Sequence, residues 1–221
     1  MGRAWALFSA AGYDQRGEDP AALAVKGRLL KGRARLASGA EARGLYAAAA
    51  EAYAAANAQL AASYLAINAA TLRLLAGDAA GASAAARGVL HQLGDPAAAM
   101  DTPYFLAATR AEAHMLLGNQ AAAQQAMEQA AQAGPDGWAD RAATVAQLRE
   151  IAAAQNSDAA WIERFAPPAS LHFAGHMGLA SGSWTEEALS AAIRNVVAAS
   201  SSARYRRVQS APAGATDWAS N

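Results

Sequence analysis

The sequence of 221 residues contains no cysteine, has no net charge and holds no long apolar run. Without cysteine there is no disulfide, no thiolate nucleophile and no cysteine-ligated zinc. Lys plus Arg equals Asp plus Glu, so no overall field attracts nucleic acid or an anionic membrane. No stretch reaches the roughly 18 apolar residues that a membrane span needs. We therefore expect a cytoplasmic protein with no nucleic-acid partner and no membrane span.

Alanine is the commonest residue, and it is the best helix former because it loses no side-chain entropy. Gly, Pro and Asp divide this alanine-rich chain into segments with helical periodicity. Asp19 is expected to cap the first of them, because Pro20 suits a first helical turn. We predict helices over residues 20–36, 40–59, 63–76, 79–93, 103–117, 120–133 and 138–154.

Two of these helix pairs repeat. SYLAINAATLRLLA ends at Gly77 and PYFLAATRAEAHMLL ends at Gly118, which is an offset of 41 residues. A tetratricopeptide unit has about 34 residues, and the loop 94–100 accounts for the excess. We predict a mainly α fold of TPR-like antiparallel hairpins, an α-solenoid, over residues 1–166. An ordinary helical bundle is the alternative.

The repeat brings polar residues to matched positions. Asn68 and Thr71 in the first pair correspond to Thr109 and Glu112 in the second. The first helices of such hairpins line the inner surface of a solenoid. These four residues are therefore candidates for recognising a protein segment there, or for bonding neighbouring helices.

The helix 20–36 carries basic residues on two faces. Arg28, Lys31 and Arg35 share one face, which we interpret as solvated. Lys26 and Arg33 fall on the other face, among leucines. Since a buried cation needs a partner, these two either pair within the protein, extend to solvent or bind an acidic ligand.

Beyond Ala166-Pro167-Pro168 the pattern changes, and we assign residues 167–221 to a second segment. A strand at 170–174, a glycine loop, a helix at 184–199 and a strand at 204–209 are expected. This order is the start of a Rossmann-like βαβ unit, in which helix amides meet a phosphate. Because two strands cannot bury both faces of a sheet, we expect an incomplete segment that is truncated, packed on the helices or frayed.

Within this segment the residues LHFAGHMG hold the candidates for a nucleotide site, namely Gly175, His176 and Gly178. His172 and His176 have the spacing of two metal ligands on a helix. The glycines and the strand pattern break that geometry, so no metal site is expected. The spacing of these glycines also differs from G-x-G-x-x-G.

Several runs resemble one bacterial family: DPAALAVKGRLLKGRARL, YLAINAATLRLLAGD, DTPYFLAATRAEAHMLLGN and LHFAGHMG. The chain resembles tetratricopeptide-repeat proteins whose helical region is similar to the TRAFs-binding domain of certain kinases. In such proteins the helices often precede a Rossmann-like, SLOG-type segment that begins near a motif like FAGHM. The resemblance covers about residues 19–178 and implies a signalling scaffold.

No nucleophile elbow and no P-loop occur in the sequence, so we expect no enzyme and no cofactor. The function that we expect is a scaffold that binds a protein or peptide, or a second copy of itself, in bacterial signalling. The alternative is a regulatory fragment whose C-terminal glycine loop senses a nucleotide in a longer parent protein.

Overall fold

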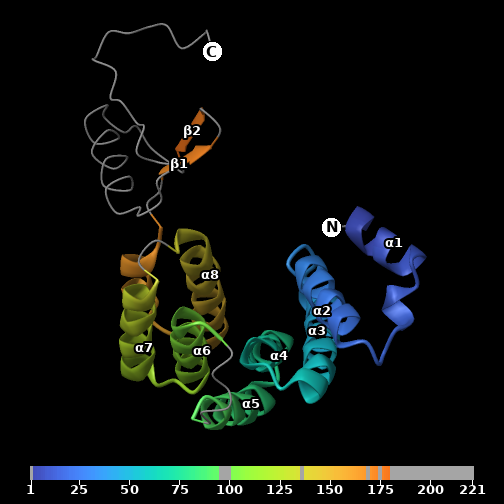
Figure 1. Ribbon diagram of the computed structural model, residues 1–221, viewed down its shortest axis with the longest axis horizontal. Coiled ribbons are helices and arrows are strands. Elements are labelled where there is room, and N and C mark those ends of the chain that lie inside the picture. The colour runs from blue at the N-terminus through green and yellow to red at the C-terminus, as the bar shows by residue number, and fades with distance from the viewer. Residues whose placement is uncertain (1, 95–100, 135–136, 168–169, 174–175, 180–221) are drawn as a thin grey trace, which may run out of the picture. The chain divides into compact units, whose positions relative to one another are not determined.

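The structure is a computed structural model that describes residues 2–94, 101–134, 137–167, 170–173 and 176–179 (Figure 1). Contacts within the chain divide it into two units, Met1–Gly134 with Ala139–Ala166, and Pro135–Trp138 with Pro167–Asn221. Each unit is described by itself. No described helix is both long and apolar enough to span a membrane.

The first unit is helical, and its helices from α2 onward agree with the predicted ranges to within two residues. The α-helices are α1 (Gly2–Ala10), α2 (Pro20–Ala34), α3 (Gly39–Leu60), α4 (Ser63–Ala76), α5 (Ala79–Gln92), α6 (Pro103–Leu116), α7 (Gln120–Ala133) and α8 (Trp138–Gln155). Two short 3₁₀ helices, η1 (Tyr13–Gln15) and η3 (Ala160–Phe165), complete the described helical elements.

Local signals set the helix ends. Asp19 caps α2 as predicted, because its Oδ1 accepts from the amides of Ala21 and Ala22 at 2.9 and 3.1 Å. Gly77 and Gly118 follow α4 and α6 with φ of 99° and 74°. Glycine adopts this left-handed conformation at the end of a helix without a steric cost, because it has no Cβ atom.

Consecutive helices pack in pairs, which confirms the prediction of a mainly helical fold. α2 packs on α3, α4 on α5 and α6 on α7, and α4 also contacts α3 and α6. α8 is bonded along α6, since Tyr104 Oη lies 3.0 Å from Thr144 Oγ1 and Gln155 Nε2 donates to the carbonyl of Leu116 at 3.1 Å.

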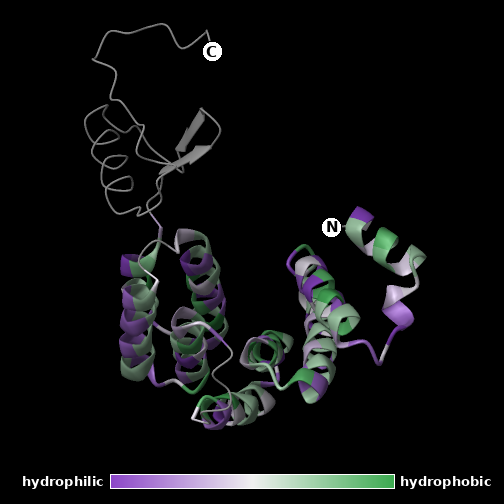
Figure 2. Ribbon diagram, in the orientation of Figure 1, coloured by the Kyte–Doolittle hydropathy of each residue, from purple (hydrophilic) through white to green (hydrophobic). Residues whose placement is uncertain are grey.

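Two apolar clusters form the core, and α4 contributes to both. Leu65 and Leu72 of α4 pack with residues of α2 and α3. Ile67 and Ala70 of the same helix pack with residues of α5, α6, α7, α8 and η3. The ribbon of α4 is accordingly coloured as apolar over most of its length, whereas polar and apolar residues alternate along α7 (Figure 2). α4 thus joins the first helix pair to the rest of the unit.

The described part of the second unit is a strand pair, β1 (Ser170–Phe173) and β2 (His176–Leu179). The strands pair antiparallel, with Leu171 opposite Gly178 and Phe173 opposite His176. The structure therefore does not support the Rossmann-like βαβ segment, because a strand lies where its glycine loop was predicted. Two residues connect β1 to β2, and so short a connection allows only antiparallel pairing. The predicted helix 184–199 and strand 204–209 lie outside the described residues.

Candidate functional site

Two exposed aromatic side chains stand one repeat apart on adjacent helices. Tyr64 in α4 and Phe105 in α6 differ by the offset of 41 residues, and they are 46% and 41% exposed. α4 and α6 contact one another. The starts of the two helices are tied by a hydrogen bond of 2.5 Å from Ser63 Oγ to Asp101 Oδ2. The two exposed rings thus occupy matched positions near the starts of two helices that contact one another.

Arg28 in α2 and Tyr64 in α4 both act on the hydroxyl of Tyr53 in α3. Burial raises the pKa of Tyr53 in α3, while the charge of Arg28 lowers it and the neighbouring Tyr64 raises it. Arg28 is exposed, as the sequence predicted. We name Arg28, Tyr64, Asn68 and Phe105 the aromatic surface.

Among the matched polar residues, only Asn68 belongs to this surface. Its Nδ2 donates to the carbonyl of Tyr64 at 2.8 Å, so its amide bonds its own helix. Thr71, 0% exposed, and Thr109 are buried between helices. Within the described residues Thr71 Oγ1 has no hydrogen-bond partner. A protein segment cannot reach the two threonines in this conformation.

Lys26 and Arg33 make contacts inside the protein, which is the first of the alternatives that the sequence left open. Lys26 Nζ donates to the carbonyl of Asp14 at 3.0 Å. The Arg33 guanidinium carbon lies 5.1 Å from the centre of the Trp5 ring, within cation–π range. Both cations fasten the N-terminal residues to α2, and nothing in their geometry points to an acidic ligand.

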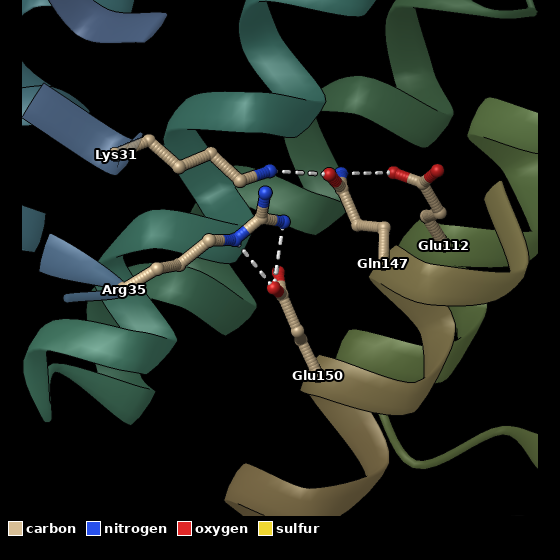
Figure 3. A network of polar contacts seen from close by, with 5 residues as sticks. All are labelled: Lys31, Arg35, Glu112, Gln147 and Glu150. Carbon is tan, nitrogen blue, oxygen red and sulfur yellow. Dashed lines mark hydrogen bonds and ion pairs between the residues drawn. The ribbon is translucent and has the colours of Figure 1, made fainter. Parts of the chain in front are cut away.

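A second set of polar residues links α2 with α6 and α8 (Figure 3). Lys31 Nζ donates to Gln147 Oε1 at 2.7 Å, and Gln147 Nε2 donates to Glu112 Oε2 at 2.6 Å. Beside this chain Arg35 binds Glu150, with 2.6 Å between Nη2 and Oε1. We name these five residues the polar bridge. The prediction of a solvated face holds for Arg35, whose side chain is 46% exposed. It is wrong for Lys31, which is half-buried against Gln147 of α8.

Burial shifts the pKa values of Glu112 and Lys31 in the polar bridge. Glu112 is 7% exposed, and desolvation raises its pKa to about 7, although Lys31 and the hydrogen bond from Gln147 lower it. Desolvation also lowers the pKa of Lys31, against the attraction of Glu150. A carboxyl group with a pKa near neutrality is a proton acceptor or donor at physiological pH.

Sequence reasoning missed Tyr64, Phe105, Gln147 and Glu150. The offset of 41 residues was the signal for the two aromatic residues, since it matches them as it matches Asn68 with Thr109. Gln147 and Glu150 stand three residues apart on α8 and share a face. No sequence signal indicates that this face lies opposite Lys31.

The glycine candidates of the second unit are not brought together as predicted. His176 and Gly178 lie in β2, and Gly175 lies outside the described residues. Neither of the two described candidates is in a loop that leads into a described helix. In the part of the chain that the structure describes, no three His, Asp or Glu residues are grouped so as to hold a metal ion.

Comparison with family models, with curated proteins and with solved structures found no match for this chain.

Proposed function

We propose that this chain is a non-enzymatic helical-repeat scaffold that binds an extended protein segment on the aromatic surface. The observation that carries the proposal is the exposure of Tyr64 and Phe105 at the same position of two adjacent helices. A single exposed aromatic side chain is ordinary on a protein surface. Two of them in register give an extended chain two anchoring points at the spacing of the helices, and aromatic residues often contribute most to binding.

The chemistry of the surface favours an acidic segment with apolar side chains. Arg28 of α2 is exposed, and α2 contains no acidic residue. A carboxylate of the partner would pair with Arg28, while its apolar side chains pack on the two rings. The partner is a different protein or a second copy of this chain, and the family resemblance suggests bacterial signalling in the cytoplasm.

Peptide selection tests the proposal. Random peptides displayed on phage are selected on the intact chain, and the dissociation constant of each selected peptide is measured by fluorescence polarisation. Tyr64→Ala and Phe105→Ala should each weaken binding about 10-fold, which corresponds to about 1.4 kcal/mol. Leu7→Ala removes an exposed apolar side chain from α1 and is the matched control, with unchanged affinity expected.

The proposal fails if selection yields no binder, or if every binder has the same affinity for both aromatic variants as for the wild type. Analytical ultracentrifugation separates a foreign partner from self-association. A dimer that Phe105→Ala dissociates identifies the second copy as the partner and keeps the aromatic surface as the interface.

A further inference from the structure

The polar bridge crosses between helices that are distant in the sequence. Lys31 and Gln147 are separated by 116 residues and Arg35 and Glu150 by 115. α2 belongs to the first helix pair, and α8 is bonded to α6. The bridge therefore fastens the first helix pair to the last described α-helix through side chains (Figure 3).

The Gln147 amide can take only one orientation in this arrangement. An ammonium group only donates hydrogen bonds, so the Gln147 oxygen must face Lys31 and its NH₂ group must face Glu112. An ionised Glu112 accepts from that NH₂ group and places a negative charge close to Lys31. A protonated Glu112 removes this charge and leaves Lys31 half-buried with less compensation, which is unfavourable.

We propose that the polar bridge is a proton-operated latch, which holds α2 against α8 while Glu112 is ionised and loosens when Glu112 binds a proton. Thermodynamic linkage determines in which direction protonation of Glu112 changes the docking of Lys31. Lys31 lowers the pKa of Glu112, and by reciprocity the ionised carboxylate strengthens the docking of Lys31. Gln147 stands between Lys31 and Glu112 and contacts both (Figure 3).

The other charged groups on the helices near Glu112 do not replace the pair of Lys31 and Glu112. Glu150 of α8 is the remaining charge that acts on Glu112, and Arg35 holds it. Arg73 of α4 pairs with Glu51 at 3.7 Å and Glu128 of α7 with Arg164 at 2.7 Å. α5 carries the exposed Arg87 and His91. His114 of α6 itself has a pKa lowered by burial and by Arg110.

Only the effect of the latch on binding rests on the proposed function, because α2 carries Arg28 of the aromatic surface. Its test needs no peptide and is therefore independent of binding. The chain lacks cysteine, so Leu36→Cys and Ala154→Cys, both at exposed positions, carry two spin labels. The distance distribution between the labels is measured by pulsed electron spin resonance from pH 5.5 to pH 8.5.

The expected result is a short, narrow distribution at high pH that becomes longer and broader at low pH, with a midpoint near pH 7. Glu112→Gln should give the long distribution at every pH. Lys31→Met, which leaves the carboxyl in place, should do the same. Circular dichroism at each pH verifies that the helices remain folded.

His114→Gln and Glu163→Gln are the controls, because the first removes a titratable side chain two residues from Glu112 in α6 and the second an exposed carboxylate. Both should keep the response of the wild type. The inference is overturned if the wild-type distances are the same at both ends of the pH range. It is also overturned if Glu112→Gln responds to pH like the wild type, or if His114→Gln abolishes the response.

Discussion

Gly27 of α2 lies against the ring of Tyr53 of α3. A Cβ atom at position 27 would stand 2.7 Å from Cδ2 of that ring, closer than carbon atoms approach without repulsion. Tyr53 is buried and belongs to the apolar cluster that joins α2, α3 and α4. The absence of a side chain at this one position allows α2 and α3 to pack as a pair.

Gly27→Ala should therefore destabilise the protein by about 1–3 kcal/mol, because the gain of about 1 kcal/mol in helix propensity is smaller than the cost of moving the ring. Gly88→Ala is the control. Gly88 lies in α5, where a Cβ atom would meet no neighbouring residue within 4 Å, so this variant should be more stable than the wild type. Urea unfolding measures both, and equal effects of the two substitutions would disprove the close packing.

The cap of α2 gives a second prediction. Asp19→Ala removes the acceptor of two amide hydrogen bonds and should cost about 1 kcal/mol in urea unfolding. Ser38 stands at the same position before α3, but its side chain makes no capping bond. Ser38→Ala should leave the stability within about 0.5 kcal/mol of the wild type. A loss at Ser38 as large as that at Asp19 would contradict the assigned cap.

The raised pKa of Glu112 predicts how stability depends on pH. The folded pKa of about 7 exceeds the ordinary value of 4.5, so the folded state holds its proton more tightly than the unfolded state does. The stability due to the protonated carboxyl is complete below pH 4.5 and is lost as the pH rises through 7. Ionisation thus weakens the whole fold, even though it strengthens the contact with Lys31.

The side chain of Glu112→Gln cannot ionise. Its free energy of unfolding relative to that of the wild type should therefore rise between pH 5 and pH 8.5, by up to roughly 3 kcal/mol. The measurement is the difference between the two unfolding free energies at each pH, in which all other titrating groups cancel. A difference that does not change with pH would show that Glu112 has an ordinary pKa.

Gln147 predicts a strongly non-additive set of variants. Gln147→Leu leaves Lys31 and Glu112 without their shared partner and should cost about 3–5 kcal/mol. The triple variant Lys31→Met, Glu112→Leu, Gln147→Leu replaces the buried chain with apolar side chains and should recover most of that loss. Urea unfolding of both proteins measures the recovery. A triple variant less stable than Gln147→Leu alone would contradict a bridge whose members depend on one another.

The sequence predicts the helices of the first unit well because their signals are local. Asp19-Pro20, Gly77 and Gly118 mark ends that depend on neighbouring residues alone. A local contact also begins η3, where Asp158 Oδ1 accepts from the amide of Ala160 at 2.9 Å. The matched positions of the two helix pairs also follow from the sequence. Only the structure shows that Tyr64 and Phe105 are exposed, whereas Thr71 and Thr109 are buried.

The polar bridge and β2 could not be predicted in this way. Lys31 looks solvated on a helical wheel, because its partner Gln147 comes from a helix 116 residues later. Gly178 suggests a loop when the sequence is considered alone. It lies in a strand because β1 offers a partner two residues before β2. Both differences arise from contacts between segments, which local patterns do not contain.

Hydrogen–deuterium exchange with a selected peptide examines the aromatic surface itself, since it reports which backbone segments the bound peptide protects. We predict slower exchange in residues 63–70 of α4 and 103–110 of α6 when the peptide is added. Protection confined to residues 170–179, with unchanged exchange in α4 and α6, would contradict a binding surface built on Tyr64 and Phe105.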